Sequence, residues 1–185
     1  EITSRSGEAT GVLRINVPFS FGLLHLAPLW PEFMAQHPKV TLDVTLADRV
    51  VDLVEEGFDM AVRIARLPNS SLVSRPLTST RLVLCASPAY LRAHGQPRHP
   101  SALAQHEVLA YSLFSMGDQW EFTGSEAGSA GVVSVKVTPR MRTNSGDTCR
   151  VAALRNNGIV LQPTFLVGSD LLAGTLAEVM PAWRS

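Results

Sequence analysis

The sequence lacks several features that mark particular classes of protein. Only two cysteines occur among 185 residues, Cys85 and Cys149, which argues against a disulfide framework and a cysteine-based zinc site. No apolar run reaches the roughly 18 residues that a membrane-spanning helix needs, and no export signal is visible at the first residue. We therefore expect a reducing compartment, the cytoplasm, and no membrane partner.

Net charge is also absent. Sixteen basic and sixteen acidic residues give a formal net charge of zero, so no global field draws this chain to nucleic acid or to an anionic membrane. If DNA is bound, another segment binds it. The hydrophobic content of 45% is sufficient for a substantial core, in one large domain or two small lobes.

Common motifs of catalysis and metal binding are missing as well. There is no G-x-S-x-G, G-x-G-x-x-G, Walker loop or H-E-x-x-H. His94, His99 and His106 are five and seven residues apart, which matches no common ligand spacing. We predict loop histidines in solvent, no metal, no cofactor and no enzymatic activity.

The most informative stretch that is present, residues 40–65, reads as strand, helix and strand. Asp48 is placed to cap the helix, and Gly57 to end it in a left-handed conformation, with Phe58 packing back on the last turn. A strand from Met60 to Ile64 follows. This crossover predicts a parallel, doubly wound sheet, in which ligands bind beyond the carboxyl ends of the strands.

Before this unit, the pattern predicts a strand over Val12–Val17, a turn over Pro18–Phe21 and a helix over Gly22–Gln36. Pro28 and Pro31 are expected to kink this helix or to make it restart. The apolar face of the helix comprises Leu23, Leu26, Leu29, Trp30 and Phe33.

The second half alternates short strands and helices, and Ser112–Gly131 predicts a hairpin with a mobile tip near 124–131. The expected strands are Arg81–Ala86, Val108–Tyr111, Val132–Val137, Ile159–Leu161 and Leu176–Val179. The first two expected helices lie between the cap Ser87 and Gly95 and over Ala102–Gln105. The third runs from Ser145 through Asn156 to a stop at Gly158, and the fourth covers Phe165–Leu172 before Gly174.

Four ordered blocks carry a family resemblance over nearly the whole chain. They are GVLRINVPFSFG at 11–22, DLVEEGFDMAVRIA at 52–65, LCASPAYLRAHGQP at 84–97 and GIVLQPTF at 158–165. Together they resemble the effector-binding region of LysR-type transcriptional regulators. The resemblance implies an α/β fold similar to type II periplasmic binding proteins, with two Rossmann-like lobes and mixed sheets around an interlobe cleft.

The same resemblance implies a domain organisation. Residues 1–10 would be a linker remnant, 11–79 lobe I, 80–180 lobe II, and 181–185 the start of a crossover back to lobe I whose remaining C-terminal segment is missing. It also implies DNA binding through a missing N-terminal winged helix-turn-helix, and a homodimer or tetramer that uses the Gly22–Gln36 helix and the Val40–Leu46 strand. The polarity of the residues predicted to line the cleft points to a small organic acid or aromatic compound as the effector. The alternatives are a solute-binding protein of a transporter and an enzyme, and the latter would need a nucleophile and base that we do not find.

In lobe I, two features point to ligand contact. Ser20 lies where a strand gives way to a helix, so it either caps that helix or receives a carboxylate or phenolic oxygen, and the family places its effector against this turn. Arg63 is unusual in an apolar strand and needs a partner, either an anionic effector or an internal carboxylate such as Asp59 or Asp43. Phe19 and Phe21 either wall the pocket or fill the core.

In lobe II, Asn144 and Ser145 form the matching turn, which either caps the next helix or faces the cleft. The whole predicted effector site comprises Pro18, Phe19, Ser20, Phe21, Arg63, Ile64, Ala65, Arg66, Thr143, Asn144, Ser145, Gln162, Pro163 and Thr164. Cys149 sits near a helix N-terminus, which lowers a thiol pKa and would permit redox sensing. Without a resolving partner nearby, we interpret both cysteines as structural.

Overall fold

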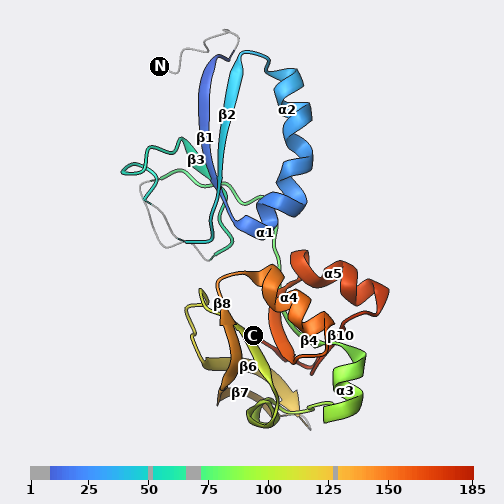
Figure 1. The fold of residues 1–185 in the computed structure, drawn as a ribbon. Coiled ribbons are helices and arrows are strands. Elements are labelled where there is room, and N and C mark those ends of the chain that lie inside the picture. The colour runs from blue at the N-terminus through green and yellow to red at the C-terminus, as the bar shows by residue number, and fades with distance from the viewer. Residues whose placement is uncertain (1–8, 50–51, 66–71, 127–128) are drawn as a thin grey trace. The chain divides into compact units, whose positions relative to one another are not determined.

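The computed structural model describes residues 9–49, 52–65, 72–126 and 129–185. The chain divides into two compact units, Glu1–Val73 and Ser74–Ser185, which we call unit 1 and unit 2. Together they form a mixed α/β fold with three sheets among the described residues. Figure 1 shows the elements of each unit. Within the described residues, no helix is long and apolar enough to cross a membrane.

Unit 1 contains a three-stranded sheet in the order β2-β1-β3. Strand β1 (Gly11–Val17) lies in the middle and pairs in parallel with β2 (Val40–Leu46) and with β3 (Met60–Ala61). The chain therefore leaves β1 to one side for β2 and then crosses to the other side for β3. This confirms the predicted parallel, doubly wound arrangement, although β3 is shorter than the predicted strand.

A continuous helical segment, 19–36, joins β1 to β2. It consists of α1 (Phe19–Phe21), the π-helical η1 (Gly22–Leu26), the 3₁₀-helical η2 (Ala27–Leu29) and α2 (Trp30–Gln36). The helix begins three residues before the predicted start. The change to 3₁₀ geometry coincides with Pro28, as expected of a residue that cannot donate to the preceding turn. On the predicted apolar face of this helix, Leu23 and Leu29 are exposed.

The described residues between β2 and β3 do not form the predicted helix. Residues 53–57 make hydrogen-bonded turns, and Asp52, rather than Asp48, accepts from the amides that begin them. Gly57 nevertheless takes the predicted left-handed conformation, with a φ of +70°, and Phe58 N donates back to Leu53 O at 2.9 Å. Val50 lies outside the described residues.

Unit 2 is built on a five-stranded mixed sheet in the order β10-β4-β9-β5-β8. These strands are β4 (Leu82–Ala86), β5 (Val108–Tyr111), β8 (Pro139–Thr143), β9 (Ile159–Pro163) and β10 (Ala177–Glu178). Strand β9 runs parallel to β5 and antiparallel to β4. The inner strands β4, β9 and β5 are largely apolar, as is typical of strands that are covered on both faces, whereas the edge strand β8 carries Arg140 and Arg142.

Two buried clusters lie on the two faces of this sheet. On one face, Val83, Cys85 and Val160 pack with residues of α4 (Gly146–Leu154) and α5 (Thr164–Ala173). On the other, Leu84 and Ile159 pack against α3 (Pro88–His94), η3 (Pro100–Gln105) and the hairpin of β6 (Gln119–Glu126) and β7 (Ser129–Lys136). The core of unit 2 is therefore layered (Figure 1).

The predicted hairpin is confirmed, and a strand that the sequence did not predict joins it. Strand β11 (Trp183–Arg184) pairs antiparallel with β6, with Trp183 opposite Gly124. The last residues of the chain thus belong to unit 2, at the position where we expected a crossover toward lobe I to begin. Residues 127 and 128 of the predicted mobile tip lie outside the described residues.

Helix ends in unit 2 follow the sequence closely, with one correction. Ser87 Oγ accepts from Tyr90 N at 3.1 Å, and Gly95 ends α3 with a φ of +84°. Helix α4 does not end at Gly158, because Asn156 takes the left-handed position with a φ of +63°. Gly158 serves instead at a close backbone approach to Glu107.

Candidate functional site

The carboxyl end of the unit 1 sheet collects polar side chains from separate elements. Asn16 is the penultimate residue of β1 and is fully buried, and Ser20 is buried in the first turn of the helical segment. Arg63 follows β3, the neighbour of β1. In open α/β sheets this position, where the chain leaves the central strand in opposite directions, is the usual ligand site.

Arg63 and Asn16 are joined by a hydrogen bond. Arg63 Nη1 donates to Asn16 Oδ1 at 2.6 Å and to the carbonyl of Val62 at 3.2 Å. The sequence suggested Asp59 or Asp43 as internal partners of Arg63. Both engage Arg14 instead. The backbone N–H of Arg14 donates to Asp59 Oδ2 at 2.8 Å, and the Arg14 guanidinium lies 3.7 Å from the Asp43 carboxylate.

The hydrogen bonds of Arg63 do not fully offset the desolvation of its guanidinium. Desolvation lowers the pKa of the Arg63 guanidinium, and the charge of Glu56 opposes this shift. Among the described residues, Arg63 Nη2 and Asn16 Nδ2 are buried without a hydrogen-bond acceptor. An unpaired buried donor costs about 1–3 kcal/mol, so each of these two donors calls for an explanation, such as an acceptor on a bound ligand.

Asn16 was not predicted from the sequence. The sequence nonetheless contained an indication of its role. Asn16 is a polar residue between Ile15 and Val17, two apolar residues that are buried in the same strand. A buried amide needs partners, and such a residue at the end of a strand points to a binding position.

The turn at the start of the helical segment was predicted in part. Asp48 Oδ1 accepts from Phe19 N at 2.8 Å, so Asp48 caps this helix rather than the next. Pro18 occupies the N-cap position, which removes simple capping as the explanation for Ser20. Phe19 is 47% exposed and does not fill the core, whereas Phe21 is half-buried.

Residues beyond Arg63 lie at the surface of unit 1. Ile64 and Ala65 are both exposed, and neither is in a strand. Arg66 lies outside the described residues. Arg63, one of the residues predicted for the lobe I site, is thus hydrogen-bonded to Asn16, which was not predicted.

The predicted turn of unit 2 caps α4. Ser145 Oγ accepts from Thr148 N at 3.2 Å, and Thr143 Oγ1 accepts from Ser145 N at 3.1 Å. These bonds satisfy backbone N–H groups at the start of α4, as expected from the first of the two predicted roles of this turn, helix capping. Asn144 is exposed between them.

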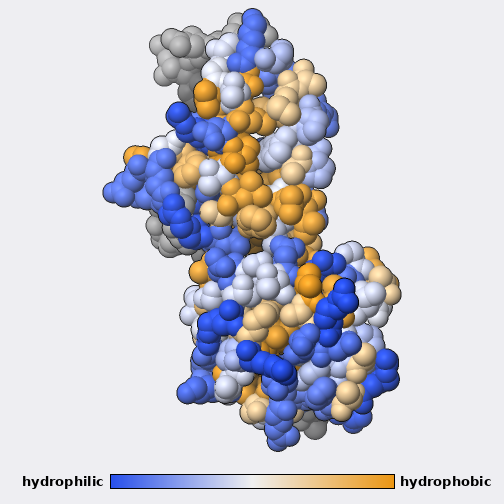
Figure 2. Space-filling model, in the orientation of Figure 1, coloured by the Kyte–Doolittle hydropathy of each residue, from blue (hydrophilic) through white to orange (hydrophobic). Residues whose placement is uncertain are grey.

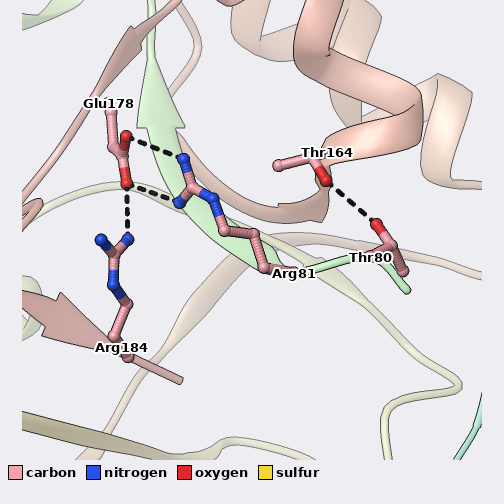
Figure 3. Close-up of polar contacts among 5 residues, drawn as sticks. All are labelled: Thr80, Arg81, Thr164, Glu178 and Arg184. Carbon is pink, nitrogen blue, oxygen red and sulfur yellow. Dashed lines mark hydrogen bonds and ion pairs between the residues drawn. The ribbon is translucent and has the colours of Figure 1, made fainter. Parts of the chain in front are cut away.

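Gln162, Pro163 and Thr164 lie at the junction of β9 and α5. Gln162 is 2% exposed, and its Nε2 has no acceptor among the described residues. Pro163 is half-buried. The hydroxyl of Thr164 lies 3.0 Å from that of Thr80, which precedes β4, and Figure 3 shows this contact.

Beside this contact, Glu178 joins two arginines (Figure 3). Arg81 approaches its carboxylate with both terminal nitrogens, at 2.9 and 3.3 Å, and Arg184 Nη1 lies 3.2 Å away. The hydrogen bond from Arg81 is the main reason that the pKa of Glu178 is lowered. The network ties β4, β10 and β11 together at the edge of unit 2.

The three histidines of unit 2 contact aromatic residues rather than standing free in loops. His94 stacks on Tyr90 at 4.3 Å, and His106 Nδ1 lies 3.2 Å from the Tyr90 hydroxyl. His99 meets Trp183 edge-on at 5.1 Å. Over the described parts of the chain, no group of three histidine, cysteine or acidic side chains is arranged to hold a metal ion.

Both cysteines are buried, and neither has the environment of a redox sensor. Burial raises the pKa of the Cys85 thiol to about 12 and that of the Cys149 thiol to about 11. The helix N-terminus therefore does not activate Cys149, because desolvation outweighs it.

We expect neither thiol to react with iodoacetamide at about pH 8 while the chain is folded, since the neutral thiol is a poor nucleophile. Intact-mass spectrometry would show the unmodified chain in buffer and two adducts in urea, which serves as the control for reagent activity. A rapid single adduct on folded protein, mapped to Cys149, would contradict the structural role.

Comparisons with known proteins agree on one family. The LysR substrate binding domain matches residues 6–185. The chain is 36% identical to an uncharacterized HTH-type transcriptional regulator of Haemophilus influenzae, over 99% of this chain and 62% of that protein. It is 30% identical to the HTH-type transcriptional activator TtdR of Escherichia coli K12, over 99% of this chain and 58% of that protein.

Solved structures give the same result for the fold. The regulatory domain of CrgA from Neisseria meningitidis, a LysR-type transcriptional regulator, superposes with a TM-score of 0.80 at 29% identity, covering 96% of this chain and 84% of that one. Full-length AphB, a Vibrio cholerae virulence activator, superposes with a TM-score of 0.83 at 27% identity, covering 96% of this chain and 59% of that one. The chain spans about three fifths of the curated relatives' length. It belongs to the LysR substrate-binding domain family.

Proposed function

We propose that this chain is the effector-sensing and dimerisation part of a transcriptional regulator. The observation that carries this proposal is a set of polar groups, the buried Asn16 and Ser20 and the half-buried Arg63, at the carboxyl end of a parallel sheet, in a chain that matches the family over residues 6–185. The effector is a small organic molecule. The protein is cytoplasmic and acts by binding rather than by catalysis.

The proposed mechanism is conformational linkage. An effector that binds one conformation more tightly than another shifts the population toward it, by no more than the difference in binding free energy. A DNA-binding segment outside this chain would read that shift. The net charge of zero supports this division, because this part carries no field to attract DNA.

Effector contacts are proposed for each unit separately. In unit 1 they comprise Pro18, Phe19, Ser20, Phe21, Arg63, Ile64, Ala65 and Arg66, to which we add Asn16. In unit 2 they comprise Thr143, Asn144, Ser145, Gln162, Pro163 and Thr164. The unpaired Nε2 of Gln162 supports its inclusion. The relatives described above are named as regulators, which favours this function over a transporter's solute-binding protein.

Dimerisation is proposed through the helical segment and β2. Leu23, Leu24, Leu29 and Met34 are between 45% and 53% exposed. Strand β2 pairs with β1 alone among the described residues, which leaves it at a sheet edge. Figure 2 shows hydrophobic residues gathered over this part of unit 1. Clusters of this kind mark interaction surfaces, and a second copy of the chain is the partner that we propose.

Replacing Leu23 and Leu29 together with glutamate is expected to convert the dimer to a monomer. Each buried leucine contributes about 1.5–3 kcal/mol, and a two-fold interface uses each residue twice, so dissociation should become at least about a hundredfold easier. Native mass spectrometry and sedimentation measure this. The matched control is Leu113→Glu, since Leu113 is 46% exposed in unit 2. Equal loss of dimer in the control, or none in the double variant, would argue against this surface.

The same native spectra test the effector. A gentle preparation of the 185-residue chain should retain a small molecule from the producing cell, or take one up from a metabolite mixture. Ser20→Ala should lower the bound fraction, because its hydroxyl lies at the proposed contact. A chain that binds no small molecule under any of these conditions would refute the sensing function.

A further inference from the structure

Unit 1 holds two buried hydrogen-bond donors whose side chains touch. Arg63 Nη1 is bonded to Asn16 Oδ1 at 2.6 Å, while Arg63 Nη2 and Asn16 Nδ2 have no acceptor among the residues that the structure describes. Asn16 is fully buried. The remaining polar capacity of this pair therefore consists of donors alone.

The orientation of the Asn16 amide follows from chemistry. A guanidinium has five donors and no acceptor, so the atom that meets Arg63 Nη1 must be the amide oxygen. The other end of the amide is then NH₂. Turning the amide over would place two donors against each other and would leave its oxygen without this bond.

The charge of Arg63 has no direct counter-ion among the described residues. Glu56 is the acid that acts on it electrostatically, but both carboxylate oxygens of Glu56 bind Arg49, at 2.8 and 2.5 Å. The other nearby acids of unit 1 are committed elsewhere: Asp59 to the amide of Arg14, Asp43 to its guanidinium, and Asp48 to the amide of Phe19. A half-buried cation without its own counter-ion is a position that an anion from outside the fold would stabilise.

The position of the pair matches a ligand site of this sheet type. Asn16 is the penultimate residue of the central strand β1, and its carbonyl accepts from Val62 N at 2.9 Å, which places Arg63 directly after the β1/β3 pairing. The strand order β2-β1-β3 reverses direction at β1. Ligands of doubly wound sheets bind beyond the carboxyl ends at this point.

We propose that the effector carries a carboxylate, and that Arg63 Nη2 and Asn16 Nδ2 bind it together. This inference rests on the proposed sensing function and specifies the chemical class of its ligand. A carboxylate has only acceptors, two oxygens with several lone pairs, and so matches two donors of which one is cationic. A neutral amide of the same shape offers one oxygen and brings donors of its own.

The test compares acids with their neutral amides. The 185-residue chain, labelled with ¹⁵N-arginine, is titrated with sodium acetate and sodium benzoate, and separately with acetamide and benzamide, at an ionic strength held constant with sodium chloride. The side-chain resonance of Arg63, assigned from its loss in Arg63→Gln, reports binding at the site. The thermal unfolding midpoint reports stabilisation of the fold.

Three variants separate the site from general salt effects. Arg63→Gln should weaken acetate binding, measured by the thermal midpoint, by about tenfold or more. Asn16→Asp supplies an internal carboxylate of the same shape, so it should raise the midpoint and abolish the response to acetate. The matched control is Arg14→Gln on the same strand, whose side chain is 55% exposed and should leave the response unchanged.

The expected result is a shift of the Arg63 resonance with the acids and none with the amides. The inference is overturned if neither acid shifts this resonance, if the amides bind as tightly as the acids, or if Arg63→Gln keeps the full stabilisation by acetate. Native mass spectra could instead show a retained neutral compound whose binding is lost in Ser20→Ala. That result would refute the proposal of a carboxylate ligand but would still support the sensing function. Absence of any retained compound would bear on the sensing function itself.

Discussion

Replacing Gly158 with alanine is expected to lower the free energy of unfolding by about 3–5 kcal/mol, one of the largest losses for a single methyl group in this chain. Gly158 has a φ of +149°, a conformation that residues with a side chain rarely adopt. A Cβ there would lie 2.5 Å from the carbonyl oxygen of Glu107. That oxygen accepts from Ile159 N at 2.8 Å, so it cannot move without loosening β9 beside β5.

Urea unfolding followed by far-ultraviolet circular dichroism measures this loss. The matched control is Gly168→Ala in α5, where an added Cβ meets nothing within 4 Å. Because alanine is the better helix former, the control should gain about 0.5–1 kcal/mol. Similar small effects at both positions would mean that Glu107 yields easily and that the contact is not tight.

Truncating Trp120 to alanine is expected to cost about 3–5 kcal/mol. Trp120 is 1% exposed, in the cluster that joins β6 to the main sheet of unit 2. The truncation leaves a cavity, because the neighbouring strands and α3 fix its walls. It also leaves the carbonyl of Gly117 without the indole donor, which lies 3.2 Å away.

Trp120→Phe separates the two causes. Phenylalanine keeps most of the packing but removes the indole N–H, so we expect a loss of about 1–2 kcal/mol in the same urea experiment. The control is Val132→Ala on the adjacent strand β7, because Val132 is 67% exposed and its truncation should change stability by less than about 0.5 kcal/mol. A cost for Trp120→Ala no larger than that of the control would contradict the layered core.

Local signals in the sequence predicted most elements, because each has its own chemistry at its ends. Ser87 before Pro88, Gly95 and Gly174 mark helix boundaries that the structure reproduces. The strand Val108–Tyr111 has the predicted bounds. These features depend on a few neighbouring residues, which is why a single sequence suffices to find them.

Features that depend on distant residues were not predicted. Asp48 has the chemistry of a helix cap, but the sequence cannot show that its partner is Phe19, 29 residues earlier, rather than the next segment. Strand β11 forms only because β6 offers it an edge. In the candidate site, Arg63 stood out in an apolar strand, whereas its partner Asn16 is 47 residues away, and only the parallel pairing of β1 with β3 brings them together.

The π-helical turn at Gly22–Leu26 means that the effect of a one-residue deletion depends on its place in this segment. A π-turn is an α-helical turn with one residue inserted. Deleting a single residue there would restore α-helical geometry and leave Leu29 and Met34 pointing nearly as before, because the turn already accommodates the extra residue. The same deletion within α2 would rotate every later helical residue by about 100°, the advance per residue of an α-helix. When relatives are aligned over this segment, a one-residue gap at Gly22–Leu26 therefore preserves the surface that the same gap in α2 would change.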